Sequence, residues 1–465
     1  MSNVIIFAFR SNPLNLELIF EVALQEASKG HDVKIAWGGE DVFYNEIYKG
    51  KNSILWMRPF YRLYSRIKSE NLNIKLDDVW LKTSFDEHPF VTFDATSPFD
   101  YFNVYHDQYS VGCAAISALT DILRVDATAL PINQTRQQLN LLCSSNIHVY
   151  NTTIEYLERE SPTKVFVFNG RFGPESAVAA AAQKLDIECS FYEWIANTGF
   201  ICWPFQTHNA KLVDRKIFEI WDRENDAAKV DVAKAWFDGR ATSVGFRIHK
   251  NSDFHVKFDK AKNSGDFLRV NKLENPYIVF FQSSDDEFIG VNAFNMTRSQ
   301  WRNQLEFVEK IAPQLPERLS LVVRLHPHMQ DKAELDRLRW RELSARLPNV
   351  KFFWEDDKVD SYALGINAQK VMCFGSTIGA EMLYQGKPVI TGSDSPYQSS
   401  SGCERAESYS QVVSLVNSQI VVDSSTVLPY GYFRSAFKGQ PTKYLEVNEK
   451  RRTLFDSVDY FAGYT

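Results

Sequence analysis

The sequence predicts an α/β protein with two doubly wound, Rossmann-like domains, and three observations support this fold class. Short apolar strands alternate with amphipathic helices along most of the chain. Polar and charged residues follow the ends of several predicted strands, which is where parallel α/β sheets bind their ligands. The length of 465 residues exceeds what one ordinary hydrophobic core supports. We therefore expect two sheets, each covered by helices.

The composition is that of a soluble globular protein and excludes several other classes. Hydrophobic residues make up 44% of the chain and charged residues 24%. The net charge of −6 gives no electrostatic footprint for nucleic acid. The six cysteines are scattered without paired spacing, so we expect reduced thiols in a cytoplasmic protein and no metal site. No window of the sequence is long and apolar enough to span a bilayer.

The first half of the chain begins with a strand–helix–strand unit. Residues 4–9 predict a buried strand, residues 16–29 an amphipathic helix, and residues 33–37 a second strand. The loop after the first strand carries Arg10 and Asn12 to the edge of the predicted sheet where ligands gather. We expect both residues, together with Arg171, on the acceptor side of a binding site.

Candidate catalytic carboxylates follow later strands of this half. Residues 164–170 predict a strand that turns at Arg171 into a helix with Glu175 in its first turn, and the next strand ends at Glu193. A carboxylate at such an edge can activate a sugar hydroxyl or attack an anomeric carbon. For Glu175, a helix-start acid favoured by the dipole is an equally good explanation. Asp107, in a polar aromatic loop, is a third candidate, for which a structural role is at least as good an explanation.

A basic helix is predicted over residues 56–68. It places Arg58, Arg62 and Arg66 four residues apart, on one helical face. A solvated surface is the ordinary explanation for such a face. The alternative is a docking patch for an anionic acceptor or for membrane headgroups, which would give peripheral membrane association.

The domain boundary is expected in a polar, aperiodic linker near residues 242–275. The first domain would span residues 1–265 and the second residues 266–435. Residues 436–465 would form a helical segment that crosses back onto the first domain.

The main candidate ligand-binding stretch of the second domain spans residues 370–397. An apolar strand leads through Gly375, Ser376 and Thr377 into a helix. Such a turn presents unpaired backbone N–H groups and two hydroxyls at the positive end of the helix dipole, and this arrangement receives phosphate or carboxylate. Glu381, one helical turn beyond Thr377, can accept hydrogen bonds from sugar hydroxyls beside that anion. The pattern predicts a nucleotide-sugar pocket.

The other candidate donor-binding residues follow neighbouring strands of this domain. The carboxyl ends of the strands in a doubly wound sheet line one crevice. A cation at Arg324 or His326 would neutralise the phosphate of a leaving group. Acidic runs at residues 285–287 and 355–357 are better explained as solvated loops than as metal ligands. The expected donor-binding set is Ser283, Ser284, Arg324, His326, Pro327, Tyr362, Ser376, Thr377 and Glu381.

Three stretches carry a resemblance to a known family: RLHPH at residues 324–328, VDSYALGINAQKVMCFGSTIGAEMLYQGKPVI at 359–390, and FNGRFGPE at 168–175. They resemble bacterial GT-B glycosyltransferases of capsule and lipopolysaccharide synthesis. The capsular polysaccharide biosynthesis group, which includes transferases that use CMP-activated Kdo, is the most similar. The resemblance is clearest over residues 275–397.

The resemblance implies two Rossmann-like domains that face each other across a cleft, with the donor in the second domain and the acceptor in the first. It implies that His326, Ser376 and Thr377 hold the donor phosphate and that Glu381 holds the ribose. It also implies that the first domain supplies a catalytic carboxylate, for which this sequence has no unambiguous match. Basic residues and helix dipoles would take the place of a metal.

We therefore expect a glycosyltransferase that needs no cofactor besides its nucleotide-sugar donor, which would be CMP-Kdo-like or an NDP-hexose. The acceptor would be a surface polysaccharide or lipopolysaccharide, as a free or lipid-linked glycan. The protein would be cytoplasmic, with the inner face of the cytoplasmic membrane as the alternative location. The competing functions are a UDP-sugar 2-epimerase, a CDP-polyol phosphotransferase and a non-catalytic glycan- or nucleotide-binding protein.

Overall fold

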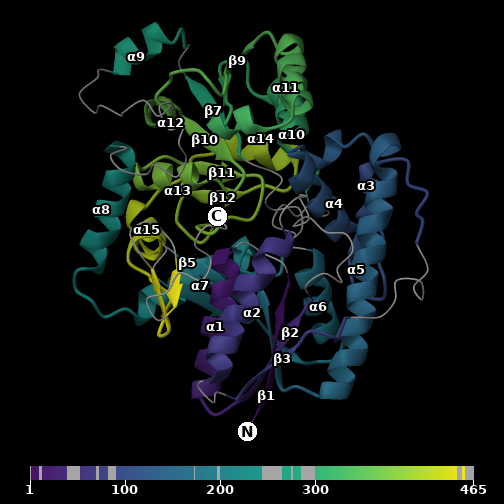
Figure 1. The fold of residues 1–465 in the computed structure, drawn as a ribbon. Coiled ribbons are helices and arrows are strands. Elements are labelled where there is room, and N and C mark those ends of the chain that lie inside the picture. The colour runs from purple at the N-terminus through teal and green to yellow at the C-terminus, as the bar shows by residue number, and fades with distance from the viewer. Residues whose placement is uncertain are drawn as a thin grey trace. The chain divides into compact units, whose positions relative to one another are not determined.

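The computed structural model forms two compact units (Figure 1). Unit 1 contains Met1–Leu123, Leu130–His208 and Lys438–Thr465, and unit 2 contains Arg124–Ala129 and Asn209–Phe437. The structure describes residues 2–9, 13–38, 53–69, 73–81, 91–171, 173–195, 199–242, 264–273, 276–283, 299–447 and 453–455.

Unit 1 is built on a mostly parallel sheet. Within the described ranges, its strand order is β13-β6-β5-β4-β1-β2-β3, in which β6 is antiparallel to both of its neighbours. Strands β2 and β3 extend the sheet on one side of β1, and β4 pairs with β1 on the other side. The strand order thus reverses between β1 and β4, and such a switch point is where an open α/β sheet binds ligands. The strands are β1 (Asn3–Ala8), β2 (Asp32–Trp37), β3 (Ile74–Asp77), β4 (Lys164–Phe168), β5 (Glu188–Ile195), β6 (Gly199–Trp203) and β13 (Gln440–Pro441), with β14 (Leu445–Val447) and β15 (Thr453–Phe455) as a separate antiparallel pair.

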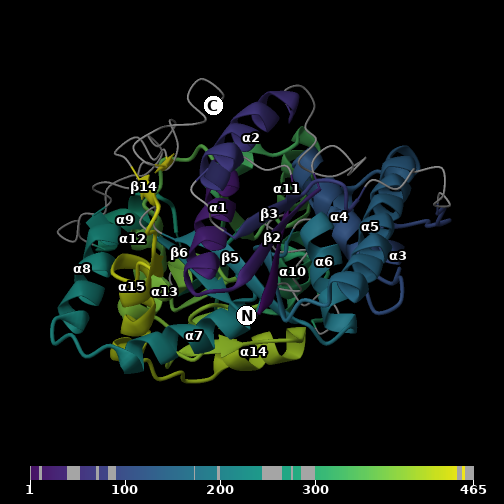
Figure 2. The same cartoon turned by 60° about the horizontal axis from the view of Figure 1, so that its bottom comes forward.

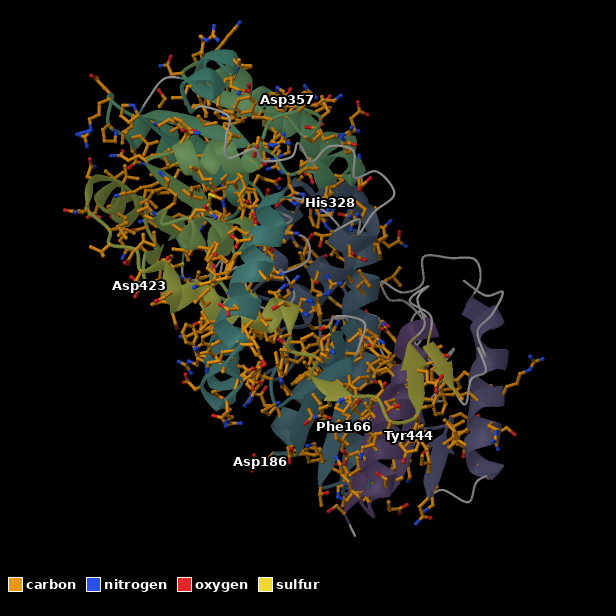
Figure 3. The ribbon with its side chains drawn as sticks, turned by 90° about the vertical axis from the view of Figure 1, so that its left-hand side faces the viewer. Phe166, Asp186, His328, Asp357, Asp423 and Tyr444 are labelled. Atoms are coloured by element: carbon orange, nitrogen blue, oxygen red, sulfur yellow. The ribbon has the colours of Figure 1, made fainter. Side chains whose placement is uncertain are left out.

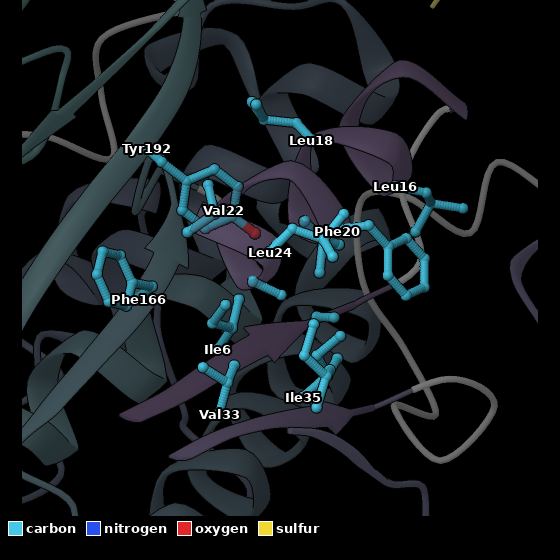
Figure 4. Packing of buried hydrophobic residues seen from close by; sticks show 14 of the residues in the cluster. Ile6, Leu16, Leu18, Phe20, Val22, Leu24, Val33, Ile35, Phe166 and Tyr192 are labelled. Atoms are coloured by element: carbon cyan, nitrogen blue, oxygen red, sulfur yellow. The ribbon is translucent and has the colours of Figure 1, made fainter. Parts of the chain in front are cut away.

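Helices cover both faces of this sheet. Figure 2 shows α1 and α2 on one side of β1–β3, and α5 and α6 on the other. In the core between α1 and the sheet, Phe20 and Val22 of the helix pack with Ile6, Val33 and Ile35 of the strands (Figure 4). The helices of unit 1 are α1 (Pro13–Ser28), α2 (Ser53–Ser69), α3 (Pro98–Tyr101), α4 (Val111–Leu123), α5 (Ile132–Glu160) and α6 (Gly173–Lys184).

Unit 2 is built on a sheet whose described strands all run parallel. The strand order is β12-β11-β10-β7-β8-β9, so the switch point lies between β7 and β10. All five side chains of β7 are buried, as expected for a central strand that is covered on both faces. The strands are β7 (Tyr277–Phe281), β8 (Ser320–Arg324), β9 (Val350–Phe353), β10 (Lys370–Cys373), β11 (Val389–Thr391) and β12 (Cys403–Arg405).

The helices of unit 2 also lie on both faces of its sheet. Helices α10, α11 and α14 contribute Phe307, Leu343 and Val412 to one core, and α12 and α13 lie on the opposite side of β7 and β10 (Figure 1). The helices are α7 (Ala210–Arg223), α8 (Lys229–Thr242), α9 (Ser264–Val270), α10 (Gln304–Ile311), α11 (Glu334–Arg346), α12 (Ser361–Asn367), α13 (Thr377–Tyr384), α14 (Tyr409–Asn417) and α15 (Leu428–Ser435), with short 3-10 turns η2 (Ala127–Ala129), η5 (Ala312–Gln314), η6 (Pro327–Asp331) and η7 (Ser424–Val427). Both units are doubly wound, and the predicted fold class is confirmed.

Two segments differ from the expected organisation. Residues 209–242 belong to unit 2, because α7 and α8 pack against α15. The described part of residues 436–465 forms the strands β13, β14 and β15 instead of helices, since Gln440 and Pro441 add to the edge strand β6. From Lys438 onward, this part of the chain belongs to unit 1.

The predicted basic helix is α2. Phe60, Leu63 and Ile67 are fully buried, whereas Arg62 and Arg66 are exposed. The side chain of Arg58 lies outside the described residues. Across the described part of the chain, no helix combines the length and apolarity needed to cross a membrane.

Candidate functional site

Two strand ends meet at the switch point of unit 2. Phe281 of β7 pairs with Cys373 of β10, so the residues that follow them lie side by side. The Ser283 hydroxyl donates a hydrogen bond of 3.0 Å to the Phe374 carbonyl, and the Ser283 N–H donates one of 2.9 Å to Gln304. Ser283 is buried and thus joins the two strand ends instead of facing solvent. Ser284 lies outside the described residues.

The turn from β10 into α13 has the predicted form. Gly375 has a φ of +65°, a left-handed conformation that glycine adopts without strain. Ser376 is the N-cap residue, and its side chain makes no capping hydrogen bond within the described structure. The Tyr397 hydroxyl donates a 2.6 Å hydrogen bond to the Ser376 carbonyl and fixes the turn. Ser376 and Thr377 are half-buried. We call their hydroxyls, together with the first N–H groups of α13, the anion cradle, because a helix start with such donors can receive an anion.

His326 lies at the start of η6, two strands away from this cradle, because β7 separates β8 from β10. Its backbone N–H donates to the Gln282 side chain at 3.0 Å, which ties the end of β8 to the end of β7. Its Nδ1 accepts a 3.1 Å hydrogen bond from the His328 N–H, so the neutral ring carries its proton on Nε2. A half-buried Nε2–H group is a suitable donor to a phosphate oxygen. Pro327 occupies the first position of η6 and fixes its start.

Arg324 has other partners than those expected from the sequence. Its side chain is buried, and its guanidinium donates to the backbone carbonyls of Trp354 and, at 3.2 Å, Asp357. Burial lowers the pKa of this guanidinium. Arg324 therefore supports the loop after β9, where Figure 3 labels Asp357, because the end of β9 lies directly beside the end of β8.

Glu381 lies in a cluster of three polar side chains. Its carboxylate is almost fully buried and accepts a 2.8 Å hydrogen bond from Nε of Arg240, on α8. Tyr362, on α12, lies within electrostatic reach of Glu381, because burial and the Glu381 charge raise the pKa of this tyrosine well above its ordinary value. Arg240 is absent from the predicted set because nothing local in the sequence connects it to Glu381.

In unit 1, the turn after β4 places Glu175 at the switch point. Asn169 and Gly170 both have positive φ, at 30° and 76°, and the Asn169 side chain accepts a 2.9 Å hydrogen bond from the Arg171 N–H. The chain then enters α6, where Glu175 is 2% exposed. Burial and the Glu175 charge raise the pKa of Tyr192, which places the carboxylate within electrostatic reach of that hydroxyl. Arg171 is half-buried, and Arg10 and Asn12 lie outside the described residues.

Two further buried polar residues of unit 1 were not predicted. Glu17 is 1% exposed on α1, which follows β1, and β1 is the neighbour of β4 at the switch point. Asn146, on α5, is fully buried, and its amide oxygen and nitrogen have no hydrogen-bond partner among the described residues. It lies against the first residue of α6, since a Cβ on Gly173 would be 2.5 Å from its Oδ1. The sequence contained a signal for Glu17, because it is an acidic residue within an apolar helix. It contained no comparable signal for Asn146.

The other two catalytic candidates lie elsewhere in unit 1. Glu193 is inside β5, because pairing with β6 extends the strand to Ile195. Its carboxylate accepts a hydrogen bond from Thr207 and lies 3.7 Å from Nδ1 of His208. Asp107 forms a 2.5 Å ion pair with Lys184. Lys184 is the last residue of α6, about 14 Å along the helix from Glu175, so the fold does not bring Asp107 to that carboxylate.

A cavity of about 20 Å³ beside Gln282 contains a second carboxyl cluster. The Asp126 N–H donates a 2.7 Å hydrogen bond to Oδ2 of Asp336, whose Oδ1 has no hydrogen-bond partner among the described residues. Burial and the Asp126 charge raise the pKa of Asp336 to about 7, against the opposing charges of Arg339 and Lys332. No group of three or more side chains suited to hold a metal occurs in the described part of the chain.

We predict that the free energy of unfolding decreases as the pH rises from about 4 to 7. A raised pKa means that native Asp336 binds its proton more tightly than in the unfolded chain, so this stabilisation is full below the unfolded pKa and is lost as the pH rises through the folded pKa. Asp336→Asn should flatten the slope and raise the unfolding free energy at pH 8 by about 2 to 4 kcal/mol. Urea unfolding between pH 4 and 8 measures both, with exposed Asp331→Asn as control. An unchanged slope in the Asp336 variant would contradict the prediction.

No family model matches the chain, and no curated protein matches it. Among solved structures, it is similar to the Thermosulfurimonas dismutans KpsC β-Kdo 2,7 transferase, with 11% identity, coverage of 61% of this chain and 80% of that chain, and a TM-score of 0.34. It is also similar to the UDP-GlcNAc 2-epimerase from Methanocaldococcus jannaschii, with 10% identity, coverage of 93% and 97%, and a TM-score of 0.30. Both enzyme classes expected from the sequence thus occur among the similar structures, and at these TM-scores the likeness carries no argument for either activity.

Proposed function

We propose that this protein is a glycosyltransferase in which unit 2 binds a nucleotide-activated sugar and unit 1 binds a glycan acceptor. One observation carries the proposal: α13 starts at the switch point of unit 2, where Ser376 and Thr377 belong to the anion cradle and His326 follows β8, two strands from β10 with β7 between them. Helix N–H groups and neutral donors suit the phosphate of a nucleotide sugar, and they stabilise the charge that develops when the glycosidic phosphate bond breaks.

Glu175 is the proposed base for the acceptor hydroxyl. It is a buried carboxylate at the switch point of unit 1, the edge at which such a sheet binds ligands. Glu17 is a second carboxylate at the same edge of the sheet.

We further propose that the donor is CMP-Kdo-like or an NDP-hexose and that the acceptor is a surface polysaccharide or lipopolysaccharide glycan. Turnover should then need no metal and should persist in excess chelator. We propose that the protein acts in the cytoplasm or at the inner face of the cytoplasmic membrane.

The UDP-sugar 2-epimerase is the second candidate, because it would use the same anion cradle and its proton transfers would also suit two buried carboxylates. The two functions differ in what they require. An epimerase forms product from the donor alone, whereas a transferase releases free nucleotide in proportion to the acceptor that is added.

The proposal is tested first by thermal shift with CMP, CDP, UDP, GDP and dTDP. A ligand that binds only the native state stabilises it by about 2.7 kcal/mol at a concentration of 100 Kd. We expect a rise in Tm with one of these nucleotides, and a smaller rise in the Ser376→Ala/Thr377→Val variant. Ser414→Ala, which removes an exposed hydroxyl on α14, serves as the matched control. No shift of the unmodified protein with any of the five nucleotides would refute the proposal.

A further inference from the structure

Arg240 is held in an unusual position for a surface arginine. Its side chain is 32% exposed, yet its Nε donates a 2.8 Å hydrogen bond to Glu381, whose side chain is only 3% exposed. A buried carboxylate is costly unless it is paired, and here Arg240 pairs with it. The buried Glu381 thus holds the Nε edge of a guanidinium whose side chain is partly exposed to solvent.

The carboxylate that holds this guanidinium belongs to α13, the helix that starts at the anion cradle. Thr377 and Glu381 are four residues apart on the same helix, so their side chains are neighbours on one face. Glu381, which holds Arg240, is therefore about one helical turn from Thr377. A guanidinium has five N–H donors in a planar fork, so it can contact a carboxylate through Nε and a phosphate through its other nitrogens.

We propose that Arg240 binds the phosphate of the nucleotide donor, and that Glu381 is a positioning residue that holds its guanidinium in place. The proposal rests on the function proposed above and extends it by adding a cation to the donor site. It also changes the expected role of Glu381, whose carboxylate orients Arg240. The planar fork is required, because a lysine ammonium cannot contact both anions in this geometry.

The affinity for the nucleotide that gives the largest thermal shift is measured by calorimetry in matched variants. Arg240→Gln should weaken binding by about 10- to 100-fold, the range expected for the loss of a charge-assisted hydrogen bond. Arg240→Lys should recover less than half of that loss on a logarithmic scale. Arg346→Gln is the matched control, because Arg346 also pairs with a glutamate of unit 2, Glu309, and ends α11 at the opposite edge of the sheet. Binding by Arg240→Gln within twofold of the unmodified protein would overturn the inference.

A double-mutant cycle tests the positioning role. Glu381→Gln should weaken binding by about 3- to 10-fold in the unmodified background and should have no further effect in Arg240→Gln, because its contribution acts through Arg240. Additive losses in the double variant would show that Glu381 acts on the ligand by itself and would overturn its assignment. If the unmodified protein binds none of the nucleotides, both the function and this inference fail; if it binds and Arg240→Gln binds equally well, only the inference fails.

Discussion

Glu175→Gln is expected to lower the transfer rate by about 10²- to 10⁴-fold while the affinity for the nucleotide stays unchanged. Glutamine keeps the shape of the buried side chain and removes its ability to accept a proton. Glu175 lies in unit 1, whereas the anion cradle lies in unit 2, so donor binding should not depend on it. The rate is measured as acceptor-dependent release of nucleotide, and the acid limb of its pH profile should disappear in the variant.

Two further variants make this experiment decisive. Asp186→Asn removes an exposed carboxylate just beyond α6 and should leave the rate unchanged. Glu17→Gln tests the second buried carboxylate at the same switch point. Full activity in Glu175→Gln together with a large loss in Glu17→Gln would transfer the role of base to Glu17. Full activity in both would place the chemistry on other residues.

Glu21→Ala is expected to lower the free energy of unfolding by about 3 to 5 kcal/mol. Glu21 is fully buried on α1, and its carboxylate accepts hydrogen bonds from the backbone N–H groups of Lys443 at 2.7 Å, Tyr444 at 3.0 Å and Leu445 at 2.8 Å. Gln25 donates a fourth at 2.6 Å. These bonds hold the C-terminal segment, on which Figure 3 labels Tyr444, against unit 1. Alanine would leave all of these donors without their acceptor.

Urea unfolding measures this loss, and hydrogen exchange of the amides of residues 443–445 locates it. Their exchange should become much faster in Glu21→Ala, while Glu158→Ala, at an exposed position on α5, should change neither quantity by more than about 0.5 kcal/mol. Unchanged protection of these amides in Glu21→Ala would show that the segment is held by other contacts.

The sequence alone determined most of the strands and helices of this protein. The periodicity of apolar residues is a local property, so the alternation of strands and helices could be read directly, and with it the two doubly wound sheets. The turn through Gly375, Ser376 and Thr377 was predictable for the same reason, because a strand, a small-residue turn and a helix follow one another within a few residues.

Only the tertiary structure decided the partners of the charged side chains. Arg240 and Glu381 are 141 residues apart, and no local pattern connects them. Arg324 ends a strand as predicted, but its guanidinium contacts the loop after β9 because the sheet places β9 beside β8. Glu193 lies inside its strand because antiparallel β6 extends the pairing. The physical reason is common to all three: hydrophobic periodicity fixes what each segment becomes, whereas the partner of a buried polar group depends on which distant segments pack against it.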